Sequence, residues 1–267
     1  MIPKIIHYVW LGDKKFGDLE NMCLESWRKY MPDYKIMRWD NSCIKDIDNL
    51  YFKQAMEHKK YAFASDYLRL KALYEYGGIY MDTDEEVLKP LDCFLEHDFF
   101  IGCQSCGSAK GLNPALVGAT THNQIAKDLL AVYDDIKFVK DDGSFNLTTN
   151  PAYFGKVLCN NKYNLKKTYL EEGSIEFYPK SVLYDCYLFG KRNKTSYATH
   201  HYAGSWKPDW KITDRLKFSF LGKQYILRKY KKNFSDVKFE TPDNEKIIFK
   251  IKTSKRSFMV LSQNKAK

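Results

Sequence analysis

The chain has 267 residues, of which 44% are hydrophobic and 28% charged, and its formal net charge is +10. These values exclude a disordered chain and fit one α/β domain with, at most, a small appendage. No apolar run reaches the roughly 18 residues that a membrane-spanning helix requires, and Met1–His7 lacks the architecture of a signal peptide. We therefore expect a cytoplasmic protein, either free or attached to the inner face of the cell membrane.

The positive charge is concentrated near the C-terminal end. Residues 211–267 carry 16 of the 43 Lys and Arg residues but 5 of the 33 Asp and Glu residues, so residues 1–210 are close to neutral. An enzyme acting on nucleic acid would be expected to surround its active site with basic residues, and this distribution argues against a nucleic-acid partner. The sequence predicts a catalytic domain over residues 1–210 and a basic extension over residues 211–267.

Apolar runs and helical spacings alternate along the N-terminal part of the chain. Short apolar runs predict strands at residues 5–10, 34–39, 79–81, 99–102 and 181–184. Helical spacing predicts helices at residues 19–30, 61–76, 125–133 and 153–158, the second of which is stopped by two glycines. Strands that alternate with helices indicate a mostly parallel α/β sheet of the nucleotide-binding type.

The C-terminal extension has a different pattern. Residues 212–230 mix apolar and basic residues, as an interfacial helix does, and residues 246–258 alternate like a strand or an extended tail. One interpretation is docking on an anionic membrane face, where lipid-linked acceptors lie. A solvated basic helix and tail is the alternative.

Two carboxylates follow the predicted strand at residues 79–81. Asp82 and Asp84 stand at positions i and i+2, so they would project to the same side of the chain. Open α/β sheets bind their ligands at the carboxyl ends of their strands, and a pair of carboxylates there suits a hard divalent cation. Such a cation can neutralise the charge that grows on a departing diphosphate. Taken alone, Asp-x-Asp is common and more often marks a solvated turn.

Three further segments carry candidate site residues. In the segment 200–208, His201 could complete a metal site and Lys207 could meet a phosphate, although a core histidine and a surface lysine explain the segment equally well. Asp66 and Arg69 share a helix face, either as a surface ion pair or as ligands for ribose hydroxyls and phosphate. Trp10 ends the first strand, where it would stack on a nucleobase or pack in the core.

Taken together, these segments resemble a known family. Residues 2–12, 64–69 and 73–84 resemble the retaining glycosyltransferases of family 32, whose sugar-binding region contains a DxD motif and which are similar to the catalytic domain of the clostridial glucosylating toxins. Residues 201–208 also resemble the metal-histidine block of the family 8 galactosyl- and glucosyltransferases. The resemblance is strong over residues 2–90 and good over residues 195–210, whereas the middle of the chain and its last fifty residues match little.

The resemblance implies a GT-A fold, Rossmann-like in its nucleotide-binding part, and a Mn²⁺ or Mg²⁺ cofactor. The implied metal ligands are Asp82, Asp84 and His201. The implied contacts to the donor are Trp10 on the base, Asp66 on the ribose or the sugar, and Arg69, Tyr80 and Gly78 elsewhere on the donor, with Lys207 on the departing diphosphate.

The reaction implied by the resemblance is transfer of a hexose, with retention, from a nucleotide-sugar (UDP-hexose favoured) to a growing bacterial glycan such as capsule or lipopolysaccharide. A module that binds a nucleotide-sugar or glycan without turnover is the alternative. A metal-dependent phosphoesterase or nuclease would be expected to use more carboxylates or histidines than the sequence supplies.

Overall fold

The computed structural model describes residues 1–103, 112–158, 163, 175–179, 196–201 and 203, together with the backbone of four later strands. The chain divides into two compact units, Met1–Ala203 and Gly204–Lys267. The division expected after Trp210 stays a prediction, because residues 204–213 lie outside the described residues.

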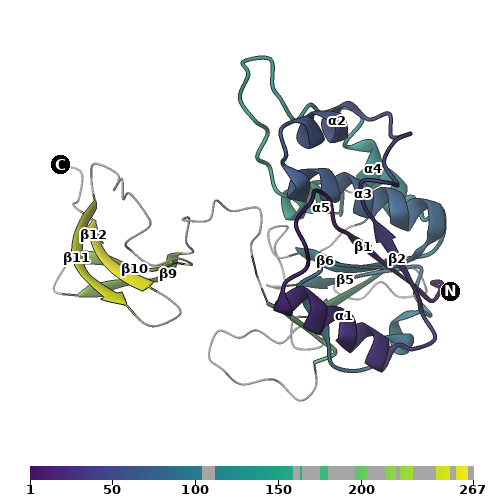
Figure 1. Ribbon diagram of the computed structural model, residues 1–267, viewed down its shortest axis with the longest axis horizontal. Coiled ribbons are helices and arrows are strands. Elements are labelled where there is room, and N and C mark those ends of the chain that lie inside the picture. The colour runs from purple at the N-terminus through teal and green to yellow at the C-terminus, as the bar shows by residue number, and fades with distance from the viewer. Residues whose placement is uncertain are drawn as a thin grey trace. The chain divides into compact units, whose positions relative to one another are not determined.

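A six-stranded sheet with the order β2-β1-β3-β6-β5-β7 forms the centre of the first unit (Figure 1). The strands are β1 (Ile5–Val9), β2 (Lys35–Trp39), β3 (Gly78–Met81), β5 (Phe99–Cys103), β6 (Leu112–Ala119) and β7 (Ile175–Pro179). β1 is parallel to β2 and β3, and β5 is parallel to β7, whereas β6 is antiparallel to both of its neighbours. One reversed strand in an otherwise parallel α/β sheet is the GT-A arrangement, which confirms the expected fold class.

Helices cover both faces of this sheet. They are α1 (Asp18–Tyr30), α2 (Leu50–Glu57), α3 (Tyr61–Tyr76), α4 (Gln124–Ala131) and α5 (Asn150–Leu158), with a short 3₁₀ turn, η1 (Asp92–Phe94). α3 lies against β1, β3 and β6, α5 lies against β6, and α2 and α4 pack on α3. Figure 1 shows α1 on the opposite face of the sheet. The helices predicted at residues 19–30, 61–76, 125–133 and 153–158 are confirmed, with small shifts at their ends.

The hydrophobic core has two parts, one packed on each face of the sheet. Because successive side chains of a strand point to opposite faces, Ile79 and Met81 of β3 join the cluster around Trp27 of α1, and Tyr80 joins the cluster around α3. All four residues of β3 are buried. The strand that leads to Asp82 is therefore held on both sides.

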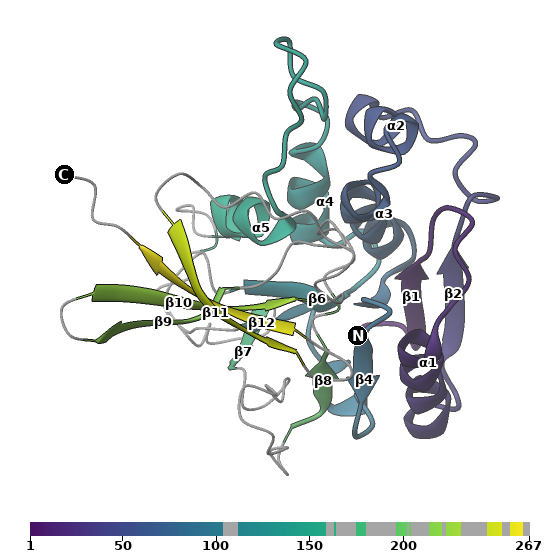
Figure 2. The same ribbon diagram turned by 60° about the vertical axis from the view of Figure 1, so that its left-hand side comes forward.

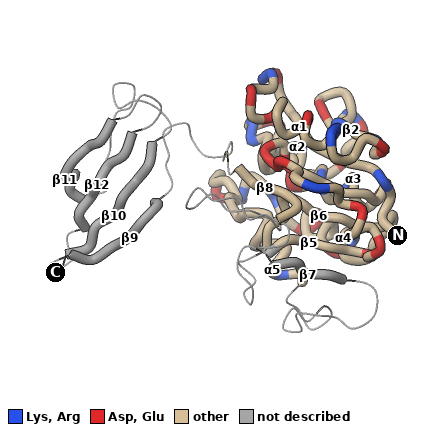
Figure 3. Tube along the Cα trace, turned by 90° about the horizontal axis from the view of Figure 1, so that it is seen from below, with Lys and Arg blue, Asp and Glu red and all other residues tan. Residues whose placement is uncertain are grey.

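A second, two-stranded sheet joins distant parts of the first unit. β4 (Glu85–Val87) pairs antiparallel with β8 (Ala198–His200), with Glu85 opposite His200 and Glu86 opposite Thr199 (Figure 2). This pairing brings the segment after the paired carboxylates next to the histidine segment. Along the described trace of the first unit, acidic and basic residues are interspersed (Figure 3).

The second unit contains a four-stranded antiparallel sheet with the order β11-β12-β10-β9. Its strands are β9 (Asp214–Phe220), β10 (Lys223–Tyr230), β11 (Glu245–Lys252) and β12 (Ser257–Gln263). The interfacial helix predicted over residues 212–230 is therefore wrong. Apolar residues recur there at every second position, as at Leu216, Phe218 and Phe220, and this period belongs to a strand.

Two other predictions concern the later part of the chain. The strand predicted within residues 246–258 is confirmed by β11 and the start of β12. The strand predicted at residues 181–184 lies outside the described residues. Among the helices that the structure describes, none has the length and apolar character needed to cross a membrane.

Candidate active site

Two glycines connect α3 to β3 and set the position of the carboxylates that follow. Gly77 has φ +62° and Gly78 has φ +104°, both in the region that only glycine adopts readily. A Cβ atom at Gly78 would lie 2.6 Å from the carbonyl oxygen of Ile5, and one at Gly77 would lie 2.6 Å from the nitrogen of Thr121. The turn is thus closely packed against its neighbours, and Gly78, implied as a donor contact, is itself buried.

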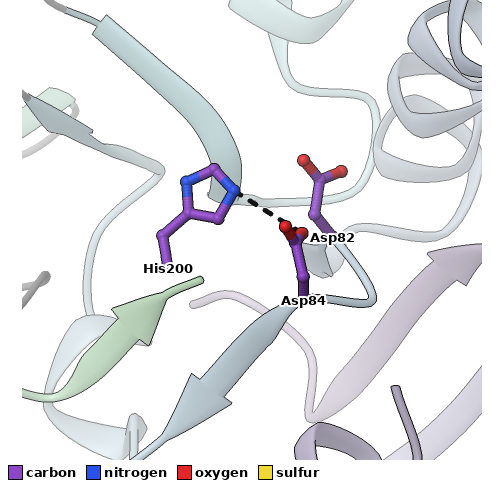
Figure 4. A group of neighbouring side chains, drawn as sticks. All are labelled: Asp82, Asp84 and His200. Atoms are coloured by element: carbon purple, nitrogen blue, oxygen red, sulfur yellow. Dashed lines mark ion pairs between the residues drawn. The ribbon is translucent and has the colours of Figure 1, made fainter. Parts of the chain in front are cut away.

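Asp82 and Asp84 lie in the turn between β3 and β4. The backbone N–H of Asp82 donates to the carbonyl oxygen of Ala115 on β6 at 2.8 Å. The Oδ2 atom of Asp84 accepts from the backbone N–H of Ala203 at 2.7 Å, and its Oδ1 atom lies 3.5 Å from Nε2 of His200. One ligand atom from each of Asp82, Asp84 and His200 lies within 4.8 Å of the others (Figure 4). Two carboxylate oxygens and one imidazole nitrogen at this spacing could hold one divalent cation.

The histidine beside the carboxylates is not the expected one. His201 does not join the group; its Nε2 atom lies 3.0 Å from Oε2 of Glu86. Adjacent residues project to opposite sides of an extended chain, so His200 and His201 face different neighbours. The structure therefore groups His200, and not His201, with Asp82 and Asp84, and the metal-ligand role expected for His201 stays a prediction.

At this site, burial and neighbouring charges shift the pKa values of Asp84 and His200 in opposite directions. Burial would raise the pKa of Asp84, but contact with His200 and the backbone N–H of Ala203 hold it below its usual value. Burial would likewise lower the pKa of His200, but the charges of Glu85 and Asp84 raise it to about 9. Because a protonated imidazole cannot bind a metal, a cation at this position would displace that proton.

Arg69 links the carboxylates to α3. Its Nη2 atom lies 2.9 Å from Oδ1 of Asp66 and 3.3 Å from Oδ1 of Asp82, and Nη1 donates to the carbonyl oxygen of Pro114 at 3.0 Å. The guanidinium group also lies 4.5 Å from the ring centroid of Tyr80. Only 7% of the Arg69 side chain is exposed, so the alternative of a surface ion pair is wrong.

Tyr80 and Asp66 complete this network. The hydroxyl of Tyr80 donates to Oδ1 of Asp82 at 2.7 Å, so Asp82 is held from two sides. Burial raises the pKa of Asp66 to about 6, although the charge of Arg69 opposes the shift. A carboxylate with few competing water contacts suits hydrogen bonds from sugar hydroxyls.

Two expected site residues remain, Trp10 and Lys207. Trp10 follows β1, is partly buried and packs against the core cluster that contains Trp27, so its role on the base stays a prediction. Its indole N–H donates to the carbonyl oxygen of Lys14 at 2.6 Å, and its ring meets the ring of Phe16 edge-on at 4.5 Å. These two contacts fix the orientation of the indole. Lys207 lies outside the described residues.

Sequence reasoning missed two residues next to His200. The Nδ1 atom of His200 lies 3.6 Å from Oε1 of Glu85 and 3.4 Å from Nδ2 of Asn113. Glu85 directly follows the carboxylate motif, which is a local signal that could have drawn attention to it. Asn113 has no such signal, because its place depends on how β6 enters the sheet.

One family of known proteins matches the region that contains the two carboxylates. The family described as "Glycosyltransferase sugar-binding region containing DXD motif" matches residues 17–101, which include Asp82 and Asp84. The chain is a glycosyltransferase with a DXD-type sugar-binding region. This confirms both the family expected from the sequence and the expectation of a transferase enzyme.

Several glycosyltransferases are similar to the chain. It is 25% identical to the uncharacterized glycosyltransferase L373 of Acanthamoeba polyphaga mimivirus over 228 residues, which cover 79% of this chain and 86% of that protein. It is 28% identical over 107 residues to inositol phosphoceramide mannosyltransferase 3 of Schizosaccharomyces pombe, a match covering 38% of this chain and 29% of that protein. It is 32% identical over 108 residues to the mannosyl phosphorylinositol ceramide synthase SUR1 of Saccharomyces cerevisiae, covering 38% and 27%. The chain thus spans less than a third of these two yeast proteins.

Solved glycosyltransferase structures also match. PaToxG glycosyltransferase shares 21% identity with a TM-score of 0.42 over 59% of this chain and 68% of that one. A glycosyltransferase involved in the glycosylation of the major capsid of PBCV-1 shares 12% identity with a TM-score of 0.44 over 74% and 93%.

Proposed function

We propose that this glycosyltransferase moves a hexose from a nucleoside diphosphate sugar to a hydroxyl group of a growing glycan, in a metal-dependent reaction that retains the anomeric configuration. The observation that carries the proposal is the group formed by Asp82 and Asp84, which follow β3, and His200 of β8. Strand ends of this kind are where α/β sheets bind nucleotides.

The ligand set fits Mn²⁺. Asp82 and Asp84 offer hard oxygen atoms, which both Mn²⁺ and Mg²⁺ accept, whereas an imidazole nitrogen from His200 favours Mn²⁺. A cation held there would supply positive charge where the departing diphosphate becomes more negative.

The protein's own groups would bind and orient the donor. Arg69 and the Tyr80 hydroxyl fix Asp82, so that this carboxylate does not have to reorient during the reaction. We propose that Asp66, which faces Arg69 at 2.9 Å, accepts hydrogen bonds from hydroxyls of the ribose or the sugar. Trp10 would stack on the base.

The expectations for Lys207 and for retention rest on the family resemblance. Lys207 would stabilise the departing diphosphate as a point charge. With Asp82 and Asp84 assigned to the metal, the working mechanism is substitution on the same face of the sugar, assisted by the diphosphate. Trapping a glycosyl group covalently on a side chain would exclude that mechanism.

Donor and acceptor are proposed at the level of classes. The resemblance favours UDP-hexose, while the mannosyltransferase names of the yeast relatives support a mannose donor as the competitor. For the acceptor we propose a bacterial surface glycan such as capsule or O-antigen, carried on a lipid at the cytoplasmic face of the membrane. The excess of Lys and Arg in residues 211–267 supports docking on anionic lipid. Failure to sediment with anionic liposomes at low salt would reject the docking proposal.

A panel of UDP- and GDP-sugars tests the proposal through donor hydrolysis with Mn²⁺. We expect hydrolysis of one donor, its loss in EDTA, and a fall of at least about 100-fold for Asp84→Asn. Asp48→Asn is the matched control, because the Asp48 side chain is 95% exposed and far from the site in sequence. Full activity in EDTA would reject the metal, and donor binding without any hydrolysis would favour the binding-module alternative.

A further inference from the structure

Glu85 carries a fully buried carboxyl group. Its exposed fraction is 0%, and neither of its side-chain oxygens has a hydrogen-bond partner among the residues that the structure describes. A buried polar group in this condition costs free energy, so it calls for an explanation in the chemistry around it. Glu85 follows Asp84 in β4 and is paired across the small sheet with His200 of β8.

The two nitrogens of the His200 ring face different groups. Nε2 points to the proposed metal site, 3.5 Å from Oδ1 of Asp84. Nδ1 points away from it, with Oε1 of Glu85 at 3.6 Å and Nδ2 of Asn113 at 3.4 Å. The neighbours of Nδ1 therefore differ in kind: one is a carboxyl group and the other an amide.

Only one of these neighbours is compatible with metal binding through Nε2. A neutral imidazole that binds a cation at Nε2 carries its proton on Nδ1, and that proton needs an acceptor. The amide oxygen of Asn113 accepts from the backbone N–H of Ala115 at 3.3 Å, which directs the Asn113 amino group, a donor, toward His200. Of these two neighbours, Glu85 is therefore the one that can accept the proton.

We infer that Glu85 is a positioning residue: it holds His200 in the tautomer whose Nε2 can bind the cation, while Asn113 stabilises the opposite tautomer. The inference rests on the metal site of the proposed function. It explains why a carboxyl group without a hydrogen bond is kept behind the histidine. Closing the 3.6 Å separation from Nδ1 to hydrogen-bonding distance takes only a few tenths of an ångström.

The neighbouring pair provides a matched control. Glu86 and His201 form the same kind of carboxylate–histidine contact at 3.0 Å, one position further along each segment, and their histidine is outside the proposed metal group. If Glu85 acts through His200, replacement of Glu86 should leave metal binding unchanged.

The experiment measures Mn²⁺ affinity by electron paramagnetic resonance of the free ion, for the full chain and for Glu85→Leu, Glu85→Gln and Glu86→Gln. We expect Glu85→Leu to bind Mn²⁺ about 10- to 100-fold more weakly, as is typical when the partner of a metal-binding histidine is lost. Glu85→Gln keeps an oxygen that can accept from Nδ1, so it should stay within about threefold of the parent. Glu86→Gln should bind like the parent.

A second readout does not depend on any variant at Glu85. With diamagnetic Zn²⁺ bound, nitrogen-15 shifts of the His200 ring should show the proton on Nδ1, with His200→Ala identifying the signal. A proton on Nε2 would overturn the inference even if Glu85→Leu failed to fold.

The outcomes separate this inference from the proposed function. If the parent chain does not bind Mn²⁺, or if His200→Ala binds it as tightly, the metal site itself is rejected. If the parent binds and folded Glu85→Leu binds equally well, the site stands and the role of Glu85 is rejected. Weaker binding by Glu86→Gln alone would point to His201 as the ligand and overturn the inference.

Discussion

His7 makes the fold of the first unit sensitive to mild acid. The residue lies in β1 and is fully buried. Its Nδ1 atom accepts from the indole N–H of Trp39 at 3.1 Å, and its Nε2 atom lies 2.8 Å from the carbonyl oxygen of Gly77. Because an indole is only a donor, the single proton of the ring must be on Nε2. This neutral ring ties β1 to β2 and to the turn that leads to Asp82.

The magnitude follows from the pKa of the ring. Burial lowers the pKa of His7 from 6.5 to about 4. Between these values the unfolded chain binds a proton that the folded chain does not bind, so the free energy of unfolding rises with pH in this window. Above pH 6.5 the ring is neutral in both states, so the loss of free energy of unfolding due to His7 is absent there. Relative to pH 7.5, we expect a loss of about 2 kcal/mol at pH 5 and about 3 kcal/mol at pH 4.

Urea unfolding followed by near-ultraviolet circular dichroism at pH 7.5 and pH 5 measures this loss. His7→Gln cannot titrate, so its loss over the same interval reports all other groups, including His200. The loss measured for the parent chain should exceed the loss measured for His7→Gln by about 2 kcal/mol. Equal losses in the two proteins, or a nuclear magnetic resonance titration of His7 near pH 6.5, would refute the reasoning.

Three further predictions concern the site and its support. Arg69→Lys replaces the planar guanidinium group by a single ammonium group, so we expect donor hydrolysis to fall about 100-fold and the free energy of unfolding to fall by about 3 kcal/mol. Steady-state kinetics and urea titration measure the two effects, and unchanged kinetics would contradict the role of the guanidinium group. Gly78→Ala adds a Cβ at 2.6 Å from backbone at a positive φ and should lower the melting temperature well below that of Gly143→Ala, which also has a positive φ but meets nothing within 4 Å; equal melting temperatures would count against the packing argument. Because burial raises the pKa of Asp66 to about 6, kcat/KM for the donor should fall about tenfold per pH unit below pH 6, and a flat profile down to pH 5 would reject its role.

Patterns among neighbouring residues were enough to predict the helix and the strand that build the site. The helix at residues 61–76 agrees with α3, and the strand at residues 79–81 lies within β3, because an Ala- and Leu-rich helix, a glycine stop and a short apolar run are all read from adjacent residues. The placement of Asp82 and Asp84 at the strand end followed directly. The wrong helix over residues 212–230 arose because a mixture of apolar and basic residues suits both an interfacial helix and a two-residue repeat.

The features of the site that the sequence could not predict depend on pairing between distant segments. The choice between His200 and His201 is set by the register of β8 against β4, in which Glu85 faces His200. A shift of one residue would exchange the two histidines. Likewise, the burial of Arg69 depends on the carbonyl oxygen of Pro114 in β6, which lies 45 positions later in the chain.

The β4–β8 pair also has a consequence for the order of folding. The hydrogen bond from Ala203 to Asp84 closes a loop of 119 positions, one of the longest closures in the first unit. Contacts of such sequence separation form slowly, because the entropy of loop closure is lost before any contact compensates it. The parallel pairing of β1, β2 and β3 can precede it. Metal affinity should therefore appear late during refolding, after most of the circular dichroism signal, and the catalytic centre would be the last part of the first unit to mature.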